Sequence, residues 1–135
     1  QYTYDCAKKM DIPYELVVAV MDVESGFQVD IISSTDDYGL MQINGTNHEW
    51  LKEMFGITDV LEPRANIVCG MYILSSMYHK YDKDIHKSLM AYNYGETRAR
   101  TKYWSNGIVK SEYSEKVVEK YETYRRTEED SGGKS

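Results

Sequence analysis

Several residue types are scarce in this chain of 135 residues, and each scarcity argues against a class of protein. The two cysteines form no CxxC pair, which argues against zinc ribbons and thioredoxin-type chemistry. Two prolines and nine glycines are too few for a collagen-like or low-complexity chain. The longest apolar run, residues 16–21, is far shorter than the ~20 residues of a membrane-spanning helix, so we expect no membrane span.

Positive charge is also scarce in the sequence. There are 16 basic residues against 22 acidic ones, which gives a net charge of −6. A negative net charge opposes binding to a phosphate backbone, so we expect no nucleic-acid partner. The content of 41% hydrophobic and 28% charged residues is that of an ordinary globular domain, which we expect to be a monomer.

Cys6 and Cys69 leave two interpretations open. A single pair in a chain of this size is compatible with one disulfide bond in an exported protein. Two buried free thiols are equally compatible with it.

The two ends of the sequence predict a domain cut from a larger protein. The first residue is Gln1 rather than methionine, so we expect a processed chain or an excised domain. The last residues are polar and contain glycines, which is typical of a linker. We therefore predict a domain over residues 1–126 and a linker-like tail over residues 127–135.

Apolar residues recur every three or four positions along most of the chain, which predicts a mostly α domain. Helices are expected from Pro13 to Gly26, across residues 50–55, from Pro63 to about residue 81, across residues 84–93, and from Tyr113 onward. Residues 27–45 break this period and are rich in Ser, Asp, Thr and Gly. We predict a loop or a small β-hairpin there.

Glu24 stands out because it shares the apolar face of its predicted helix. It follows Val17, Val20 and Met21 by seven, four and three residues. A carboxyl group on an apolar face is costly to ionise, and such a group suits a general acid near neutral pH. The alternative is a glutamate at the helix end whose carboxylate extends into water.

Four segments in order resemble the soluble-type lytic transglycosylases of glycoside hydrolase family 23, in the lysozyme-like superfamily. They are ESGF at 24–27, GLMQIN at 39–44, PRANI at 63–67 and AYNYG at 91–95. The resemblance covers residues 7–121 and implies a lysozyme-like helical domain with a small hairpin region. The stretch QIN at 42–44, with DYG at 37–39 before it, is also similar to animal lysozymes and to the wall-opening transglycosylases of conjugation systems.

The resemblance implies a role for each residue that matches a family motif. It makes Glu24 the catalytic acid, Tyr92 a hydroxyl close to that acid, and Tyr113 a second helping tyrosine. Residues implied to contact the sugar are Ser25, Met41, Gln42, Ala91 and Asn93, and Ser25 is also expected to orient the carboxylate. Tyr94 departs from the family, which usually has a small residue there, so its ring either adds a stacking surface or narrows a sugar subsite.

Structural interpretations remain open for several of these residues. Met41 and Ile43 are of a type that commonly fills a core. Asn44 and Asn93 are of a type that commonly caps turns. Asp36 and Asp37 follow Glu24 by 12 and 13 residues, and they are either solvated turn residues or a second carboxylate for a hydrolase.

The resemblance further implies the substrate and its location. It implies an exported enzyme of the extracellular space or cell envelope that cleaves peptidoglycan glycan strands between N-acetylmuramic acid and N-acetylglucosamine. The product is a 1,6-anhydro sugar, and neither a metal nor an organic cofactor is required. The predicted tail suggests fusion to a second wall-acting domain. The alternatives are a lysozyme-like hydrolase and a catalytically idle glycan-binding module.

Overall fold

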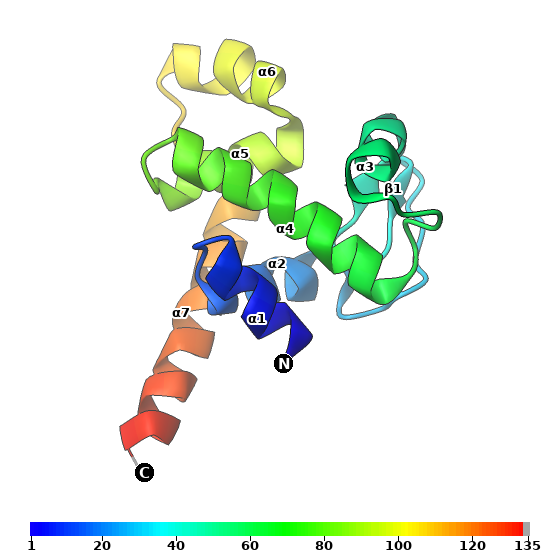
Figure 1. Cartoon of the computed structure of the whole chain (residues 1–135). Coiled ribbons are helices and arrows are strands. Elements are labelled where there is room, and N and C mark those ends of the chain that lie inside the picture. The colour runs from blue at the N-terminus through cyan, green and yellow to red at the C-terminus, as the bar shows by residue number, and fades with distance from the viewer. Residues whose placement is uncertain (134–135) are drawn as a thin grey trace. The chain divides into compact units, whose positions relative to one another are not determined.

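Helices make up most of the computed structural model, which describes residues 1–133 (Figure 1). This confirms the predicted mostly α fold. The chain divides into two compact units, Gln1–Ile73 and Leu74–Ser135. Helix α4 (Pro63–Lys80) carries residues of both units. Within the described residues, no helix has the length and apolar character that crossing a membrane requires.

The first unit begins with two helices and continues with a hairpin. Helix α1 packs against α2, and a short 3₁₀ turn, η1, leads into α3. Figure 1 shows the hairpin beside α3. The elements that precede α4 are α1 (Tyr2–Lys9), α2 (Tyr14–Ser25), β1 (Asp37–Tyr38), β2 (Ile43–Asn44), η1 (Gly45–Asn47) and α3 (His48–Phe55).

Helix α2 is set by the residues at its two ends. Pro13 precedes it with φ −58° and ψ 126°, so the proline ring directs the chain into the first helical turn. Gly26 ends it in the left-handed conformation, with φ 59°, and its amide donates to the carbonyl oxygen of Asp22. Between these ends the side chains of Leu16 and Val17 have no exposed surface.

Strands β1 and β2 form the small antiparallel hairpin that the irregular sequence predicted. Asp37 pairs with Asn44 and Tyr38 with Ile43. Ile43 is buried, which anchors one strand in the core of this unit. The remaining backbone between Phe27 and Gly45 is irregular, and Ile32 adds only one isolated bridge to Tyr38.

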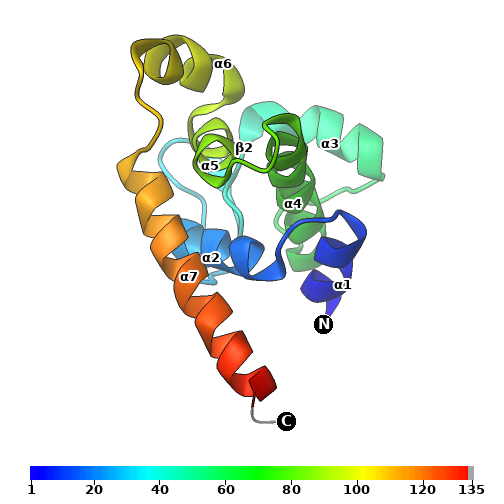
Figure 2. The same cartoon turned by 90° about the vertical axis from the view of Figure 1, so that its left-hand side faces the viewer.

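In the second unit, α5 packs against α7 and α6 (Figure 2). Ser88, Leu89, Met90 and Ala91 of α5 are buried, as is Val117 of α7. The elements of this unit that follow α4 are α5 (Ile85–Tyr94), α6 (Glu96–Arg98), the π-helical turn η2 (Ala99–Tyr103), the 3₁₀ turn η3 (Trp104–Asn106) and α7 (Glu112–Gly133).

Cys6 and Cys69 are both free thiols, and burial raises the pKa of Cys69 to about 11.

The predicted tail, residues 127–135, starts within α7, which continues to Gly133. The last two residues of that tail lie outside the described part of the chain.

Candidate active site

Glu24 is the next-to-last residue of α2. It lies on the helix face that is buried in the preceding turns. Val17 and Val20 have no exposed surface, and Met21 is 6% exposed. Glu24, one turn later, is intermediate in exposure. The predicted apolar stripe is therefore present up to Met21, and Glu24 stands where that stripe reaches the end of the helix.

Ser25 ties this end of the helix to the loop between the two strands. Its hydroxyl is buried and lies 2.8 Å from the carbonyl oxygen of Leu40 and 3.0 Å from that of Met21. A hydroxyl has one proton, so it donates to one of these oxygens at a time. Both contacts hold Ser25, the residue next to Glu24, in place.

Asn66 of α4 holds the same loop from the other side, a role that the sequence analysis did not assign. Its side-chain oxygen accepts from the amide of Met41 at 2.8 Å. Its side-chain nitrogen donates to the carbonyl oxygens of Tyr38 and Val60, each at 2.8 Å. Asn66 is fully buried, and a side chain at Gly39 would collide with its amide. The glycine thus lets the loop approach the asparagine closely.

Met41 and Gln42 occupy different environments in this loop. The Met41 side chain has no exposed surface and packs over Gly70. Any contact that Met41 makes with a ligand would therefore use its backbone. Gln42 is half-buried with φ 51°, and its side-chain nitrogen donates to the carbonyl oxygens of Gly39 and Ile31 at 3.0 and 3.3 Å.

The hairpin uses the carboxylate of Asp37 in its own hydrogen bonds. One oxygen of Asp37 accepts from the hydroxyls of Ser33 and Thr35, and the other accepts from the Asn44 amide at 3.1 Å. Asp36 is exposed with φ 64°. These contacts support the interpretation that Asp37 and Asn44 are structural residues of the hairpin.

In the second unit, the AYNYG segment forms the last turn of α5 and the glycine after it. Ala91 is 4% exposed, Tyr92 is intermediate and Asn93 is exposed. Gly95 ends the helix with φ 87°, and its amide donates to the carbonyl oxygen of Ala91. The three residues thus span the helix from its core side to its solvent side.

Tyr113 lies in the first turn of α7, which is fastened at its start by two serines. The Ser111 hydroxyl accepts from the amide of Ser114, and the Ser114 hydroxyl accepts from the amide of Ser111, both at 2.9 Å. This reciprocal cap satisfies amides that a helix start leaves unpaired. Nδ1 of His86 in α5 lies 2.8 Å from the Ser114 hydroxyl, so the cap also joins α7 to the helix that carries Tyr92.

Tyr94 is engaged within its own unit. Its ring stacks on Tyr103 with centroids 4.3 Å apart and an interplanar angle of 7°. The Arg98 guanidinium lies over the same ring, 5.2 Å from its centroid. The Tyr94 ring therefore packs against residues of the helical turns that follow α5.

The predicted site residues thus form two sets, one in each unit. The first unit places Glu24 and Ser25 beside the loop of Met41 and Gln42 through the Ser25–Leu40 contact. The second unit has Ala91, Tyr92 and Asn93 on α5, which packs against the α7 helix of Tyr113. One set offers a carboxyl group and the other offers two phenols, which are groups that can donate, accept and hold a proton.

Comparison with known proteins assigns the family. The family model described as Transglycosylase SLT domain matches residues 1–114, and the chain belongs to this family. The chain is similar to the lytic transglycosylase Slt of Pseudomonas aeruginosa, solved as an inactive mutant with glutamine in place of a glutamate, at 23% identity and a TM-score of 0.78. It is similar to the 70-kDa soluble lytic transglycosylase in complex with bulgecin A, at 25% identity and a TM-score of 0.80. The match to the Escherichia coli enzyme of that size has 23% identity and a TM-score of 0.78.

The matches cover most of this chain but a small part of each solved protein. Each match covers 93% of this chain but only 23–24% of the other chain. The chain therefore spans about a quarter of the length of the solved proteins it resembles. The matches confirm the predicted lysozyme-like transglycosylase fold.

Proposed function

We propose that this domain is a lytic transglycosylase that cleaves the glycan strands of peptidoglycan in the cell envelope. The observation that carries the proposal is the position of Glu24, at the end of a helix face that is otherwise buried. Family membership supports the proposal, because the matching family model describes a transglycosylase domain. The inactive Pseudomonas aeruginosa mutant, which replaces a glutamate by glutamine, shows that a glutamate is essential in that relative.

In the proposed reaction Glu24 serves first as acid and then as base. Its carboxyl group donates a proton to the glycosidic oxygen as the bond between N-acetylmuramic acid and N-acetylglucosamine breaks. The resulting carboxylate takes the proton of the C6 hydroxyl of the same muramic acid, and that oxygen bonds to the anomeric carbon. The product is 1,6-anhydro-muramic acid, and no water is consumed. The nucleophile is already part of the substrate, which is a gain in proximity.

The other predicted residues support this step. We assign the hydroxyl of Tyr92 to the acid's surroundings and Tyr113 to a second stabilising phenol. Ser25 positions the backbone at Glu24, as its contact with Leu40 supports. Gln42, Ala91 and Asn93 are assigned to sugar binding.

A two-carboxylate hydrolase is the main alternative. Hydrolytic glycosidases usually pair an acid with a second carboxylate that acts as nucleophile or base. The hydrogen bonds of Asp37 within the hairpin weigh against its use in that role. Asp36, the other candidate, is exposed in the same loop, and its substitution tests it. The proposal uses Glu24 as its one carboxyl group.

Replacing Glu24 by Gln tests whether the acid is essential. The change keeps the shape of the side chain but removes its acidic proton, so clearing of a bacterial-wall suspension should fall by about 10²–10⁴-fold. Glu15→Gln, in the first turn of the same helix, is the matched control and should clear walls at the wild-type rate. A Glu24→Gln protein as active as the control would refute the assignment.

A further inference from the structure

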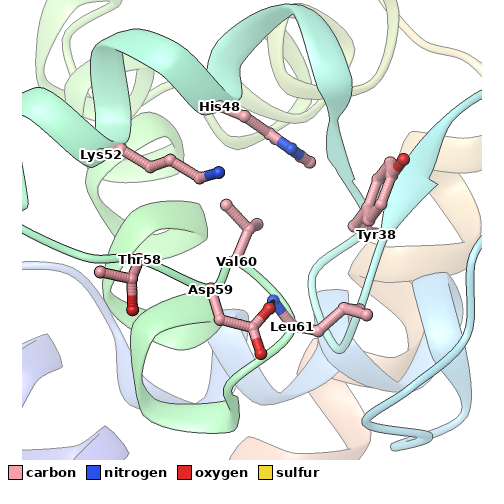
Figure 3. A pocket seen from close by; sticks show the side chains of 7 residues that line it. All are labelled: Tyr38, His48, Lys52, Thr58, Asp59, Val60 and Leu61. Atoms are coloured by element: carbon pink, nitrogen blue, oxygen red, sulfur yellow. Dashed lines mark hydrogen bonds between the residues drawn. The ribbon is translucent and has the colours of Figure 1, made fainter.

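The first unit holds a small pocket that the proposed chemistry does not use. Its volume is about 270 Å³, slightly below the ~300 Å³ at which pockets for drug-sized ligands begin, so it suits a ligand of one or two amino acids. Figure 3 shows its walls. His48 and Lys52 enter it from α3, Tyr38 from β1, and residues 58–61 from the loop before α4.

One wall of the pocket is made of two rings that contact each other. The rings of Tyr38 and His48 meet edge to face, with centroids 4.5 Å apart. Nε2 of His48 lies 3.1 Å from the carbonyl oxygen of Ile43, which fixes the orientation of the imidazole. Val60 is 4% exposed and adds an aliphatic surface. A ligand would thus find the carbon atoms of two rings, held at an angle to each other, for its own apolar atoms.

The pocket also contains one cation and one anion that do not pair with each other. No acidic side chain among residues 1–127, whose side chains the structure describes, lies within ion-pair distance of Lys52. Asp59 accepts the amide of Leu61 at 3.0 Å through one oxygen, which holds its carboxylate in place. Figure 3 shows Lys52 extending from the helix side and Asp59 from the loop side.

We propose that this pocket binds the end of a short peptide, and that the bound part carries both a free ammonium group and a carboxylate. Lys52 would receive the carboxylate, Asp59 the ammonium group, and the Tyr38–His48 wall the atoms between them. A neutral sugar would leave both charges unused, and a simple anion would be repelled by Asp59. Peptidoglycan carries short peptides of this chemistry. That link rests on the proposed function, whereas the binding test below does not.

Titration of the ¹⁵N-labelled chain with the dipeptide alanyl-alanine tests the proposal. Amide resonances of residues 48–61 should shift with about millimolar affinity, as expected for so small a ligand. The N-acetylated dipeptide and the dipeptide amide each lack one charge, and each should bind about fivefold more weakly. Absent shifts, or equal affinity for all three peptides, would overturn the proposal.

Variants assign each charge to its partner. Lys52→Gln should weaken alanyl-alanine about fivefold and leave the affinity for the dipeptide amide unchanged. Asp59→Asn keeps an oxygen that accepts from the Leu61 amide. It should weaken the binding of alanyl-alanine but not the binding of the N-acetylated dipeptide. Glu53→Gln, an exposed neighbour outside the pocket, is the control and should bind as wild type. Two results would overturn the proposal. One is that Lys52→Gln and Asp59→Asn bind alanyl-alanine as tightly as this control does. The other is that N-acetylglucosamine shifts the same amide resonances in all the variants.

Discussion

The Ser25 hydroxyl lies 2.8 Å from the carbonyl oxygen of Leu40, 15 residues further along the chain. This contact joins the end of α2, with its glutamate, to the hairpin loop. Asn66 holds the same loop through the amide of Met41. Buried side chains therefore hold both the residue after Glu24 and the loop that this residue contacts, as the proposed role of Glu24 as an oriented acid requires.

Removing this contact should affect both stability and turnover. Ser25→Ala leaves the Leu40 carbonyl oxygen without its side-chain donor, a loss of about 1–2 kcal/mol that should lower Tm by about 3–8 °C. Turnover of peptidoglycan should fall more than the loss of folded protein explains, because the acid is less well oriented. Thermal melting and product release under the same conditions measure the two effects. Ser105→Ala, which removes an exposed hydroxyl contact to Thr101, should change neither.

Tyr92→Phe should lower turnover much more than it weakens glycan binding. The change keeps the ring and removes only the hydroxyl that we assign to the surroundings of Glu24. Steady-state kinetics and binding to insoluble peptidoglycan separate the two quantities. Tyr4→Phe, on the exposed side of α1, is the control. If binding drops while turnover at saturation holds, Tyr92 is a substrate contact instead.

His86 should make the stability of the chain depend on pH. Burial, followed by the nearby Lys110 charge, lowers the pKa of His86 below its ordinary value of 6.5. The unfolded chain therefore takes up this proton before the folded chain does. The contribution of His86 to stability is complete above pH 6.5 and is lost as the pH falls toward the lowered pKa.

Denaturant unfolding at pH 7.5 and pH 5.5 measures this effect. The wild type should lose more stability between these two values than His86→Asn does. Equal losses in both proteins would contradict the assignment. The comparison with the variant is needed because carboxylates contribute their own dependence at lower pH.

The helices with clear end signals could be predicted from the sequence, and those without could not. Pro13 and Gly26 bracket α2, and Pro63 begins α4, as predicted. Helix α1 was missed because it is short and polar and buries only Ala7. The helical and π-helical turns over residues 96–106 were missed because their apolar residues follow no helical period.

The prediction of the site shows the same division. Sequence motifs predicted Glu24 and the loop of Met41 as site residues, because those residues stand in recognisable segments. They did not reveal the three hydrogen bonds of Asn66 or the contact of Ser25 with Leu40. Apart from the Asn66–Val60 bond, which spans 6 residues, these contacts join atoms that are 15 to 28 residues apart in the chain. The signal available in the sequence was a polar asparagine directly before Ile67, in the apolar pattern of α4.

The mass of the released sugar tests the central claim most directly. If Glu24 works without a second carboxylate, digestion of peptidoglycan should release muropeptides that end in 1,6-anhydro-muramic acid, one water lighter than hydrolysed ends. Asp36→Asn and Asp37→Asn should each keep substantial activity and give the same product. The hairpin already uses the carboxylate of Asp37. Release of reducing muramic acid ends by the wild type, with loss of that activity in either Asp36→Asn or Asp37→Asn, would contradict the account and identify a two-carboxylate hydrolase.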